Sequence, residues 1–450
     1  MSRHPSIAVL AALVVAALAP AQRGVRAVTT SAESHQDAKI SPDGSTIAFR
    51  GPNKLAVVPY VGGAELVLAT SSTLGEFLWT PTGGGLYFID AGTVKYVTRT
   101  GGSVITVRAI PGQQQHIHCV TKDDKSIYGS RYDPTSTRFT IFTLATNGQS
   151  APSDIVQSVL TLDAVALDPS GAKMVYREYY GGTPFANREY WLALSSGVGA
   201  VSLTNGPISG QLDQAEFVDN GNTVAFTSIA TTIPTFQIGT LANGNSTIRY
   251  LTDSPGLARR SSVFPDRKWI ACESSFPPAS GARIAIIPAD GGGKILLDPN
   301  KPLTLYGNPT ADAGGTKIAF CAIEQGVTTI PQVYAIELDR ELRIRPRLET
   351  GKIAFFELPV GLNDLGGFFL AGGLASTPLT IGGLQYSYDL DLATSVPIYN
   401  GTSGSGVLQL VIGVPNDPAL VGQVLYWQGL RVSLISVTGD FTRWVSTRIF

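Results

Sequence analysis

The segment Ile40-Ser41-Pro42-Asp43-Gly44-Ser45-Thr46-Ile47-Ala48-Phe49 indicates the fold, because it has the pattern of a tight turn between two short strands. The Asp-Gly pair tolerates the positive φ that a tight hairpin requires, and the proline before it fixes φ where the turn begins. Apolar residues flank the turn on both sides and favour β-strands. We therefore predict a β-hairpin with its turn at residues 42–44.

The same pattern of an apolar residue, a polar turn and a short strand recurs along the chain. Its seven copies begin at Ile40, Trp79, Val120, Leu167, Phe217, Val263 and Thr310. Their intervals of roughly 40 to 50 residues match the length of one four-stranded propeller blade. Further strand-like runs follow each copy, and sheets stacked around a closed ring bury both of their faces. The sequence predicts an all-β fold with a seven-bladed β-propeller over residues 22–352.

The repeats also carry a family resemblance. Ser41-Pro42-Asp43-Gly44 followed by Ile47-Ala48-Phe49, with its looser copies, resembles the WD-like repeats of TolB-type propellers. Related repeats form the propeller domains of the prolyl-oligopeptidase group. The resemblance covers about residues 28–352 and implies a propeller fold. It does not extend to peptidase activity, because the chain has no Gly-x-Ser-x-Gly motif and its C-terminal region has no histidine for a catalytic triad.

The repeat ends near Gly351, and residues 353–450 contain strand-like runs of another rhythm. A segment of this length is large enough to have its own core. We predict a small C-terminal β-sandwich-like domain there. Two segments are candidates for the strand that closes the propeller ring, residues 24–30 and residues 343–348.

The first residues predict an extracytoplasmic location. Residues 7–19 are uniformly apolar, and Ala19-Pro20-Ala21 supplies the small residues of a signal-peptidase site, so residues 1–21 have the pattern of a signal peptide. No later stretch is apolar for long enough to cross a membrane, and we expect no transmembrane segment after cleavage. The protein is expected to be secreted or periplasmic. The chain has 3 cysteines, an odd number, so at least one thiol is expected to be unpaired within the chain.

The charge balance argues against a nucleic-acid partner. The chain has 33 Lys and Arg against 34 Asp and Glu, so it produces no strong global field. Charged residues make up only 15% of the chain while glycine numbers 49, which suits short strands joined by tight turns.

The residues just before each predicted inner strand are the candidate ligand-binding residues. In propellers this position lies near one mouth of the central channel. Polar or ionisable side chains occur there in every copy: Asp37, Glu76, His116, Asp163, Asp213, Arg259, Arg260 and Tyr306, with Asn308 two residues after Tyr306.

A second hypothesis concerns a metal ion. His116 and His118 share one face of a strand, since side chains alternate with period two. Gln113-x-x-His116-x-His118 resembles part of the metal site of oligogalacturonate lyases, which are also propellers. With His35 added, His35, Gln113, His116 and His118 are the candidate ligands for Mn²⁺ or Zn²⁺.

Nothing in the sequence requires an enzyme, and no cofactor is expected in the favoured interpretation. It is a non-enzymatic extracytoplasmic binding or scaffold propeller that engages a protein or a glycan at the channel rim. The alternative is a metal-dependent polysaccharide (uronate) lyase that uses the His-x-His site. A third interpretation is a purely architectural repeat protein with no discrete ligand.

Overall fold

The computed structural model describes residues 24–449, except 182–186, 205, 207, 210–214, 230–234, 246, 253–255, 276–281, 299–300, 339–342, 346–347, 361, 363, 381–383, 386, 434–437 and 444. Among these residues the secondary structure is almost entirely β-strand, and the one helical element is a short 3-10 turn, Pro418–Leu420. The described residues divide into two compact units. One is Gly24–Ala285 with Asp298–Glu337, and the other is Ile286–Leu297 with Leu338–Phe450.

Each of the first six repeats folds into one sheet whose first four strands follow in chain order. The first three sheets consist of β2 (Gln36–Ile40), β3 (Thr46–Arg50), β4 (Lys54–Pro59) and β5 (Leu66–Thr70); β6 (Leu74–Trp79), β7 (Gly85–Asp90), β8 (Thr93–Thr98) and β9 (Ile105–Ala109); and β10 (Gln113–Val120), β11 (Ser126–Asp133), β12 (Arg138–Ala145) and β13 (Ser153–Ser158).

The next three sheets are built in the same way, and the fourth has one additional short strand. Their strands are β14 (Thr161–Leu167), β15 (Lys173–Gly181), β16 (Asn187–Leu194), β17 (Val201–Ser202) and β18 (Ile208–Ser209); β19 (Glu216–Phe217), β20 (Thr223–Ile229), β21 (Phe236–Ala242) and β22 (Arg249–Tyr250); and β23 (Ala258–Val263), β24 (Trp269–Ser274), β25 (Arg283–Pro288) and β26 (Ile295–Leu296).

The seventh sheet joins the two ends of the ring. It contains β27 (Leu303–Leu305), β28 (Thr310–Ala311), β29 (Lys317–Glu324) and β30 (Gln332–Glu337), and its outermost strand is β1 (Arg26–Ala27). Val28 donates its backbone N–H to the Val333 carbonyl at 2.8 Å, and the Val333 N–H donates to Thr29 Oγ1 at 3.0 Å. Of the two predicted closing segments, residues 24–30 therefore supply the strand.

The repeated turn contains a residue with positive φ in all seven sheets. These residues are Gly44, Gly83, Asp124, Gly171, Gly221, Arg267 and Gly315. In the described turns, six of them donate their N–H to the carbonyl three residues earlier, as Gly44 does to Ser41 at 2.8 Å. Asp124 and Arg267 adopt φ of 57° and 60°, so the two copies that lack glycine here still form the predicted turn.

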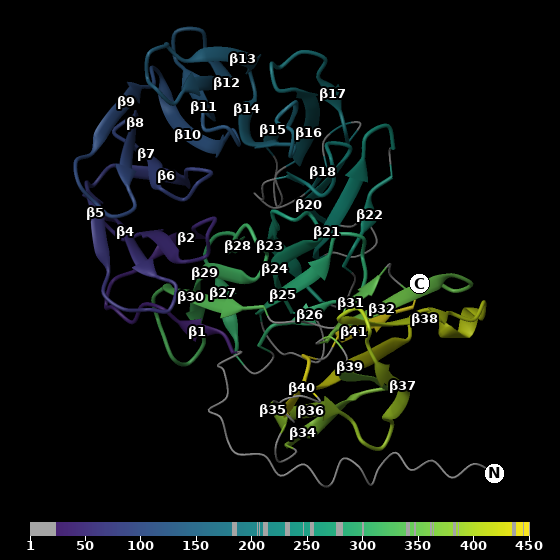
Figure 1. The fold of residues 1–450 in the computed structure, drawn as a ribbon. Helices are drawn as coiled ribbons and strands as arrows, with labels where there is room; N and C mark the ends of the chain where they lie inside the picture. Colours follow the sequence, from purple (N-terminus) through teal and green to yellow (C-terminus); the bar gives the residue numbers. More distant parts are fainter. Residues whose placement is uncertain are drawn as a thin grey trace, which may run out of the picture. The chain divides into compact units, whose positions relative to one another are not determined.

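Neighbouring sheets pack face to face around a common centre, as Figure 1 shows for the strands coloured purple to green. Buried apolar clusters join successive sheets, for example Phe77 and Leu86 of the second sheet with Leu55 of the first. Another cluster joins the first sheet to the seventh through Phe49 and Val333. Each side chain of this size contributes about 1.5–3 kcal/mol on full burial. The predicted all-β propeller is confirmed.

The second unit is a β-sandwich-like domain, and it extends beyond the predicted residues 353–450 to Ile286–Leu297 and to the residues from 338 onward. Its two main sheets have the strand orders β31-β32-β38 and β35-β40-β39-β33-β37, β41 pairs with β39, and β34 pairs with β36. The strands are β31 (Arg343–Arg345), β32 (Ile353–Pro359), β33 (Leu365–Ala371), β34 (Leu374–Thr380), β35 (Leu384–Gln385), β36 (Ser387–Leu390), β37 (Val396–Thr402), β38 (Val407–Gly413), β39 (Val424–Ser433), β40 (Thr438–Phe441) and β41 (Val445–Arg448).

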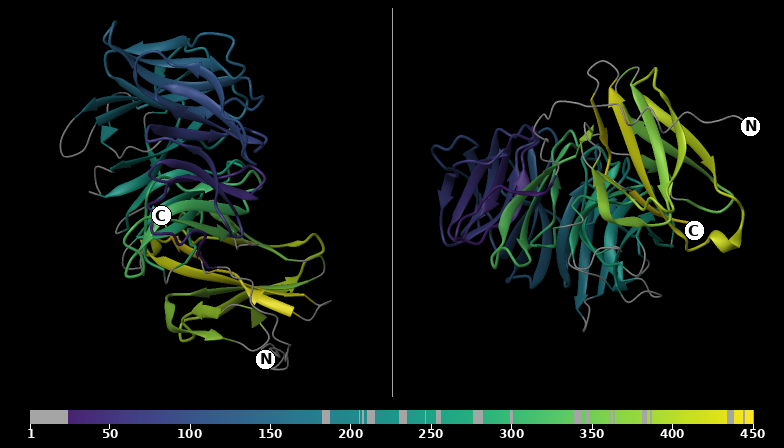
Figure 2. Two further views of the ribbon diagram at one scale, coloured as in Figure 1. Left: turned by 90° about the vertical axis from the view of Figure 1, so that its left-hand side faces the viewer. Right: turned by 90° about the horizontal axis from the view of Figure 1, so that it is seen from below.

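The core of this domain lies between its two main sheets. The rings of Phe356 and Trp427 face each other with centroids 4.4 Å apart, and Leu358 packs against the backbone of Gly429. Figure 2 shows these strands, coloured light green to yellow, as stacked layers. The other closing segment predicted from sequence is part of this domain, because β31 pairs with β32.

Cys119, Cys272 and Cys321 are all free thiols. Within the described part of the chain, no helix has the length and hydropathy that a membrane crossing requires. The predicted signal peptide, residues 1–21, lies outside the described residues.

Candidate functional site

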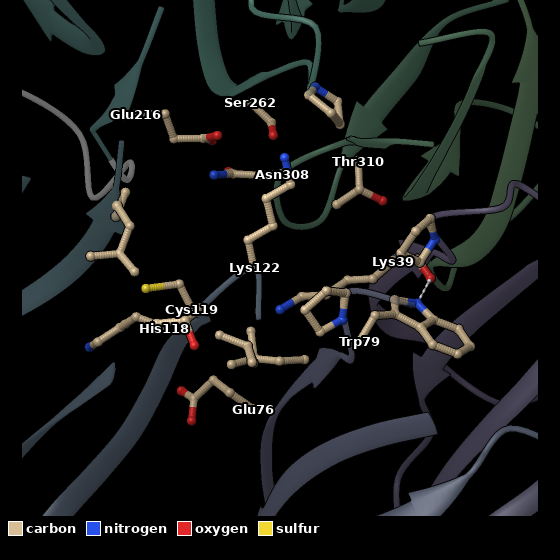
Figure 3. Close-up of a pocket in the computed structure, with 18 of the residues that line it drawn as sticks. Lys39, Glu76, Trp79, His118, Cys119, Lys122, Glu216, Ser262, Asn308 and Thr310 are labelled. Atoms are coloured by element: carbon tan, nitrogen blue, oxygen red, sulfur yellow. Dashed lines mark hydrogen bonds between the residues drawn. The ribbon is translucent and has the colours of Figure 1, made fainter. Parts of the chain in front are cut away.

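A cavity of about 1270 Å³ lies at the centre of the propeller ring, and its wall includes residues from all seven sheets. We call this cavity the channel. Figure 3 shows side chains of its wall, among them Lys39, Glu76, His118 and Glu216, around a common space. A central channel is a usual ligand site in propellers because many strands and loops converge on it.

One residue from each sheet lines the channel at the same register. In every sheet, it belongs to the second-to-last cross-strand pair before the repeated turn. The seven pairs are Lys39–Ala48, Leu78–Tyr87, Cys119–Tyr128, Ala166–Val175, Glu216–Ala225, Ser262–Ala271 and Thr310–Ala319. The first members of these pairs all line the channel, and we call them the channel ring.

Four of the predicted mouth residues line the channel: Asp37, Glu76, His116 and Asp163. His116 Nδ1 lies 2.6 Å from Glu76 Oε1, which links the second and third sheets. This hydrogen bond raises the pKa of His116 against the opposing effect of burial, and the charges of Glu76 and Asp163 add to the rise. Burial acts to raise the pKa of Glu76, but its hydrogen bond with His116 and the charge of His116 lower it overall. The two shifts have the directions expected if each group stabilises the charged form of the other.

His118 lies beside His116 on the same wall, with ring centroids 6.2 Å apart and ring planes at 20°. Its Nε2 lies 2.9 Å from Ser130 Oγ on β11. Burial lowers the pKa of His118 to about 4. His118 is consequently neutral where His116 carries a proton.

The acidic mouth residues of the first and fourth sheets are paired with arginines. Asp163 accepts two hydrogen bonds from the buried Arg177, at 2.8 Å from Nε and 2.9 Å from Nη2. Asp37 forms an ion pair with Arg50 on the neighbouring strand. Bidentate and charge-assisted contacts of this kind fix side-chain orientation. The mouth is thus preorganised by partners within the protein.

Lys39 extends along the wall between the first and second sheets. Its Nζ donates to the Phe77 carbonyl at 2.7 Å and lies 5.1 Å from the centroid of the Phe77 ring. Trp79 Nε1 donates to the Lys39 carbonyl at 2.8 Å, the bond dashed in Figure 3. Burial lowers the pKa of Lys39, and the charges of Asp37 and Glu76 oppose the effect.

The opposite wall contains Glu216, which sequence reasoning missed. Burial raises the pKa of Glu216 to about 7, against the charge of Arg267 and hydrogen bonds from Ser262 and the Val263 backbone. Asn308 also lines the channel, and Figure 3 shows its amide among the central side chains. A polar subsite therefore lies on the fifth to seventh sheets; Asn308 is the rim residue that the sequence places two positions after Tyr306, and Glu216 is the addition.

Three other predicted mouth residues are not part of the channel wall. Arg259 and Arg260 both bind the fully buried Glu273 on β24, with N–O distances of 2.7 Å and 3.0 Å. Glu273 Oε2 also accepts the Leu305 N–H at 2.8 Å, which joins the sixth sheet to the seventh. The Arg260 guanidinium lies 5.9 Å from the centroid of the Tyr306 ring. This group has a structural role between two sheets. Asp213 lies outside the described residues.

The four candidate metal ligands do not converge. His35 is completely buried, with its Nε2 2.8 Å from Ser31 Oγ and its ring edge against Phe49. Neither His35 nor Gln113 lines the channel that contains His116 and His118. Throughout the described ranges, no three His, Cys, Asp or Glu side chains are grouped so that they could hold a metal ion. The predicted four-ligand site therefore does not fit Mn²⁺ or Zn²⁺, because His35 is directed into the packing of the first sheet.

No known family model matches the chain, and no curated protein matches its sequence. Among solved structures, an oligogalacturonate lyase in complex with manganese has a TM-score of 0.55 at 13% identity, with 71% of this chain and 95% of that chain covered. The oligogalacturonate lyase of Vibrio parahaemolyticus has a TM-score of 0.56 at 9% identity, over 70% and 93% of the two chains. A puromycin-hydrolyzing peptidase of Mycobacterium tuberculosis has a TM-score of 0.52 at 13% identity, over 75% and 61%.

At these identities the similarity concerns the fold alone. The chain is a β-propeller. Its repeats form the fold that their resemblance to TolB-type propellers implied.

Proposed function

We propose that this protein is a non-enzymatic binding propeller that works outside the cytoplasm and takes a segment of a protein or a glycan into its channel. The observation that carries the proposal is the prearranged polar wall. Glu76 with His116 and Asp163 with Arg177 are held by partners of the protein itself, on the wall of a cavity of about 1270 Å³. A wall held in this way loses little side-chain entropy when a ligand binds.

The extracytoplasmic location rests on the signal-peptide pattern of residues 1–21. Secretion of a reporter fused to residues 1–30, with cleavage after Ala21 found by N-terminal sequencing, would support it. Retention of the reporter in the cytoplasm would count against it.

The binding proposal is tested by filling the channel. Asn308 is half-buried in the wall, so Asn308→Trp places a large ring in the ligand space. Asn243→Trp is the matched control, because Asn243 is exposed and does not line the channel. Both variants and the wild type are applied to glycan and peptide arrays. We expect Asn308→Trp alone to lose the ligands that the wild type binds. Equal binding by all three proteins, or no ligand for the wild type, would refute the proposal and favour the architectural interpretation.

The alternative from another functional class is the metal-dependent uronate lyase. The adjacent His116 and His118 favour it, but His35 and Gln113 do not join them. Metal analysis of the purified protein and of a His116→Ala/His118→Ala variant tests this alternative. Equal and negligible metal in the two proteins, with no cleavage of oligogalacturonate, would exclude it.

A further inference from the structure

The channel ring has a charge pattern that the predicted mouth residues do not have. The sheets follow one another around the ring in chain order, so the channel-ring residues do as well. Two of the seven carry ionisable groups of opposite type, Lys39 on the first sheet and Glu216 on the fifth. Three sheets separate them in one direction and two in the other. The cation and the acid therefore face each other across the channel at one depth, and Figure 3 shows them on different sides of the cavity.

The two arcs between these charges differ in polarity. The arc of the second to fourth sheets consists of Leu78, Cys119 and Ala166, and burial raises the pKa of the Cys119 thiol to about 12, which keeps it neutral. The other arc consists of Ser262 and Thr310, which carry hydroxyl groups, and the Asn308 amide lies beside it on the wall. Among these seven residues, one side is therefore apolar and the other is hydrogen-bonding, while Lys122 of the third turn also lines the channel.

Both charged groups have capacity left for a ligand. The Lys39 ammonium has three N–H donors, and the contact with the Phe77 carbonyl uses one of them. Glu216 lies beside Ser262 and Arg267 without a direct ion pair among the described contacts of the channel. A carboxyl in such a site gains from a cation that enters the channel, since opposite charges attract more strongly where water is excluded.

From this arrangement we propose that the ligand of the channel is a short zwitterionic peptide, whose ammonium end binds Glu216 and whose carboxylate end binds Lys39. An apolar side chain of the peptide lies against Leu78, Cys119 and Ala166, and its amide groups face the hydroxyl arc. This inference rests on the proposed binding function and narrows its ligand from a protein segment or glycan to a peptide with free ends.

The experiment measures binding of Ala-Leu-Ala to the whole protein by titration calorimetry. The peptide is used with free ends, with an acetylated amino end, or with an amidated carboxyl end. A series from one amino acid to four finds the length that spans the two charges. We expect each blocking group to weaken binding by about tenfold or more, since it removes a charge-assisted contact.

Two variants assign the ends. In Glu216→Gln, acetylation is expected to lose its effect while amidation keeps it, and in Lys39→Met the reverse is expected. Lys39→Arg keeps the charge and serves as the matched control, and thermal melting establishes that each variant is folded. A general loss of folding would instead weaken all three peptides equally.

Proton release gives a second readout that does not depend on affinity. An ammonium next to Glu216 favours its ionised form, so peptide binding near pH 7 should expel a proton from this carboxyl. Calorimetry in two buffers of different ionisation enthalpy measures the release, and its difference between the wild type and Glu216→Gln isolates Glu216.

The inference is overturned if blocked and free peptides bind equally, or if each variant weakens all peptides alike. Binding of a glycan that Asn308→Trp abolishes, with no binding of any peptide, would overturn the peptide ligand and leave the proposed binding function in place. Absence of every channel ligand would overturn both.

Discussion

Replacing Glu216 by glutamine should make the protein more stable at alkaline pH and leave its stability nearly unchanged at acidic pH. The fold raises the pKa of Glu216 from an ordinary 4.5 to about 7. A raised carboxyl pKa means that the folded state holds the proton more tightly than the unfolded chain. Its contribution to stability is therefore fully present below pH 4.5 and is lost as the pH rises through 7.

The size of this effect follows from the two pKa values. Each tenfold change in an acidity constant is worth about 1.4 kcal/mol, so the rise from 4.5 to about 7 means that the ionised Glu216 costs on the order of 3 kcal/mol above pH 7. Glutamine keeps a hydrogen-bonding oxygen for Ser262 and has no charge to bury. We expect Glu216→Gln to exceed the wild type by this amount at pH 8 and to match it at pH 4.5. At about 2–4 °C per kcal/mol, the difference in Tm at pH 8 is about 6–12 °C.

The assay is urea or thermal unfolding of the ligand-free protein at several pH values from 4.5 to 8. The difference between variant and wild type is used, because the other titrating groups cancel in it. Glu76→Gln is the matched control, since the same substitution is made in the same channel. The fold lowers the pKa of Glu76, so this variant should lose stability relative to the wild type above pH 4.5. A pH-independent difference for Glu216→Gln would refute our account of the opposite wall.

Three further predictions concern the same architecture. Burial lowers the pKa of His118 from 6.5 to about 4, so its stability contribution is present above pH 6.5 and lost as the pH falls through 4; His118→Gln should flatten the acid limb of a pH–stability curve measured by urea unfolding. Glu273→Ala leaves two arginines without their buried partner and should cost about 3–5 kcal/mol in urea unfolding, whereas Arg259→Ala should cost clearly less. Gly44→Ala should destabilise the protein by about 1–2 kcal/mol in thermal melting, because Gly44 has φ of 67°, which strains a residue with a Cβ.

The fold could be read from the sequence because its main signal is local. The turn at residues 42–44 needs one residue with positive φ. In most copies that position can be recognised in the sequence because it is glycine or has a short polar side chain. Arg267 is the exception, since arginine gives no such signal, and the spacing of its neighbours identified the sixth copy instead. The closing strand was left open because β1 is two residues long, and pairing with a strand more than 300 residues away has no local pattern.

The channel residues were only half predictable, because the inner strands are irregular where they begin. A register shift occurs in the first strands of five sheets, between Gln36 and Lys39, Leu74 and Phe77, Gln113 and His116, Asp163 and Ala166, and Arg259 and Ser262. A β-bulge redirects the side chains next to it. The alternation of side chains along the strand therefore no longer shows which residue faces the channel. Arg260, with φ of 54°, is one such residue, and its guanidinium reaches Glu273 on the neighbouring strand.

The same strands are regular at their other end, next to the repeated turn. A channel site is therefore best located in the sequence by counting from the turn. Between the channel ring and the repeated turn there is one further cross-strand pair in every sheet, so the distance in sequence from the turn to the ring is constant. Aligning the copies at their turns and stepping back along each inner strand identifies Lys39 and Glu216, whereas aligning them at the strand starts does not. The turn fixes the register because its positive-φ position is shared, and the mouth varies because bulges are free to differ between sheets. The residues most informative about the ligand are therefore those at a fixed number of residues before the turn that all seven copies share.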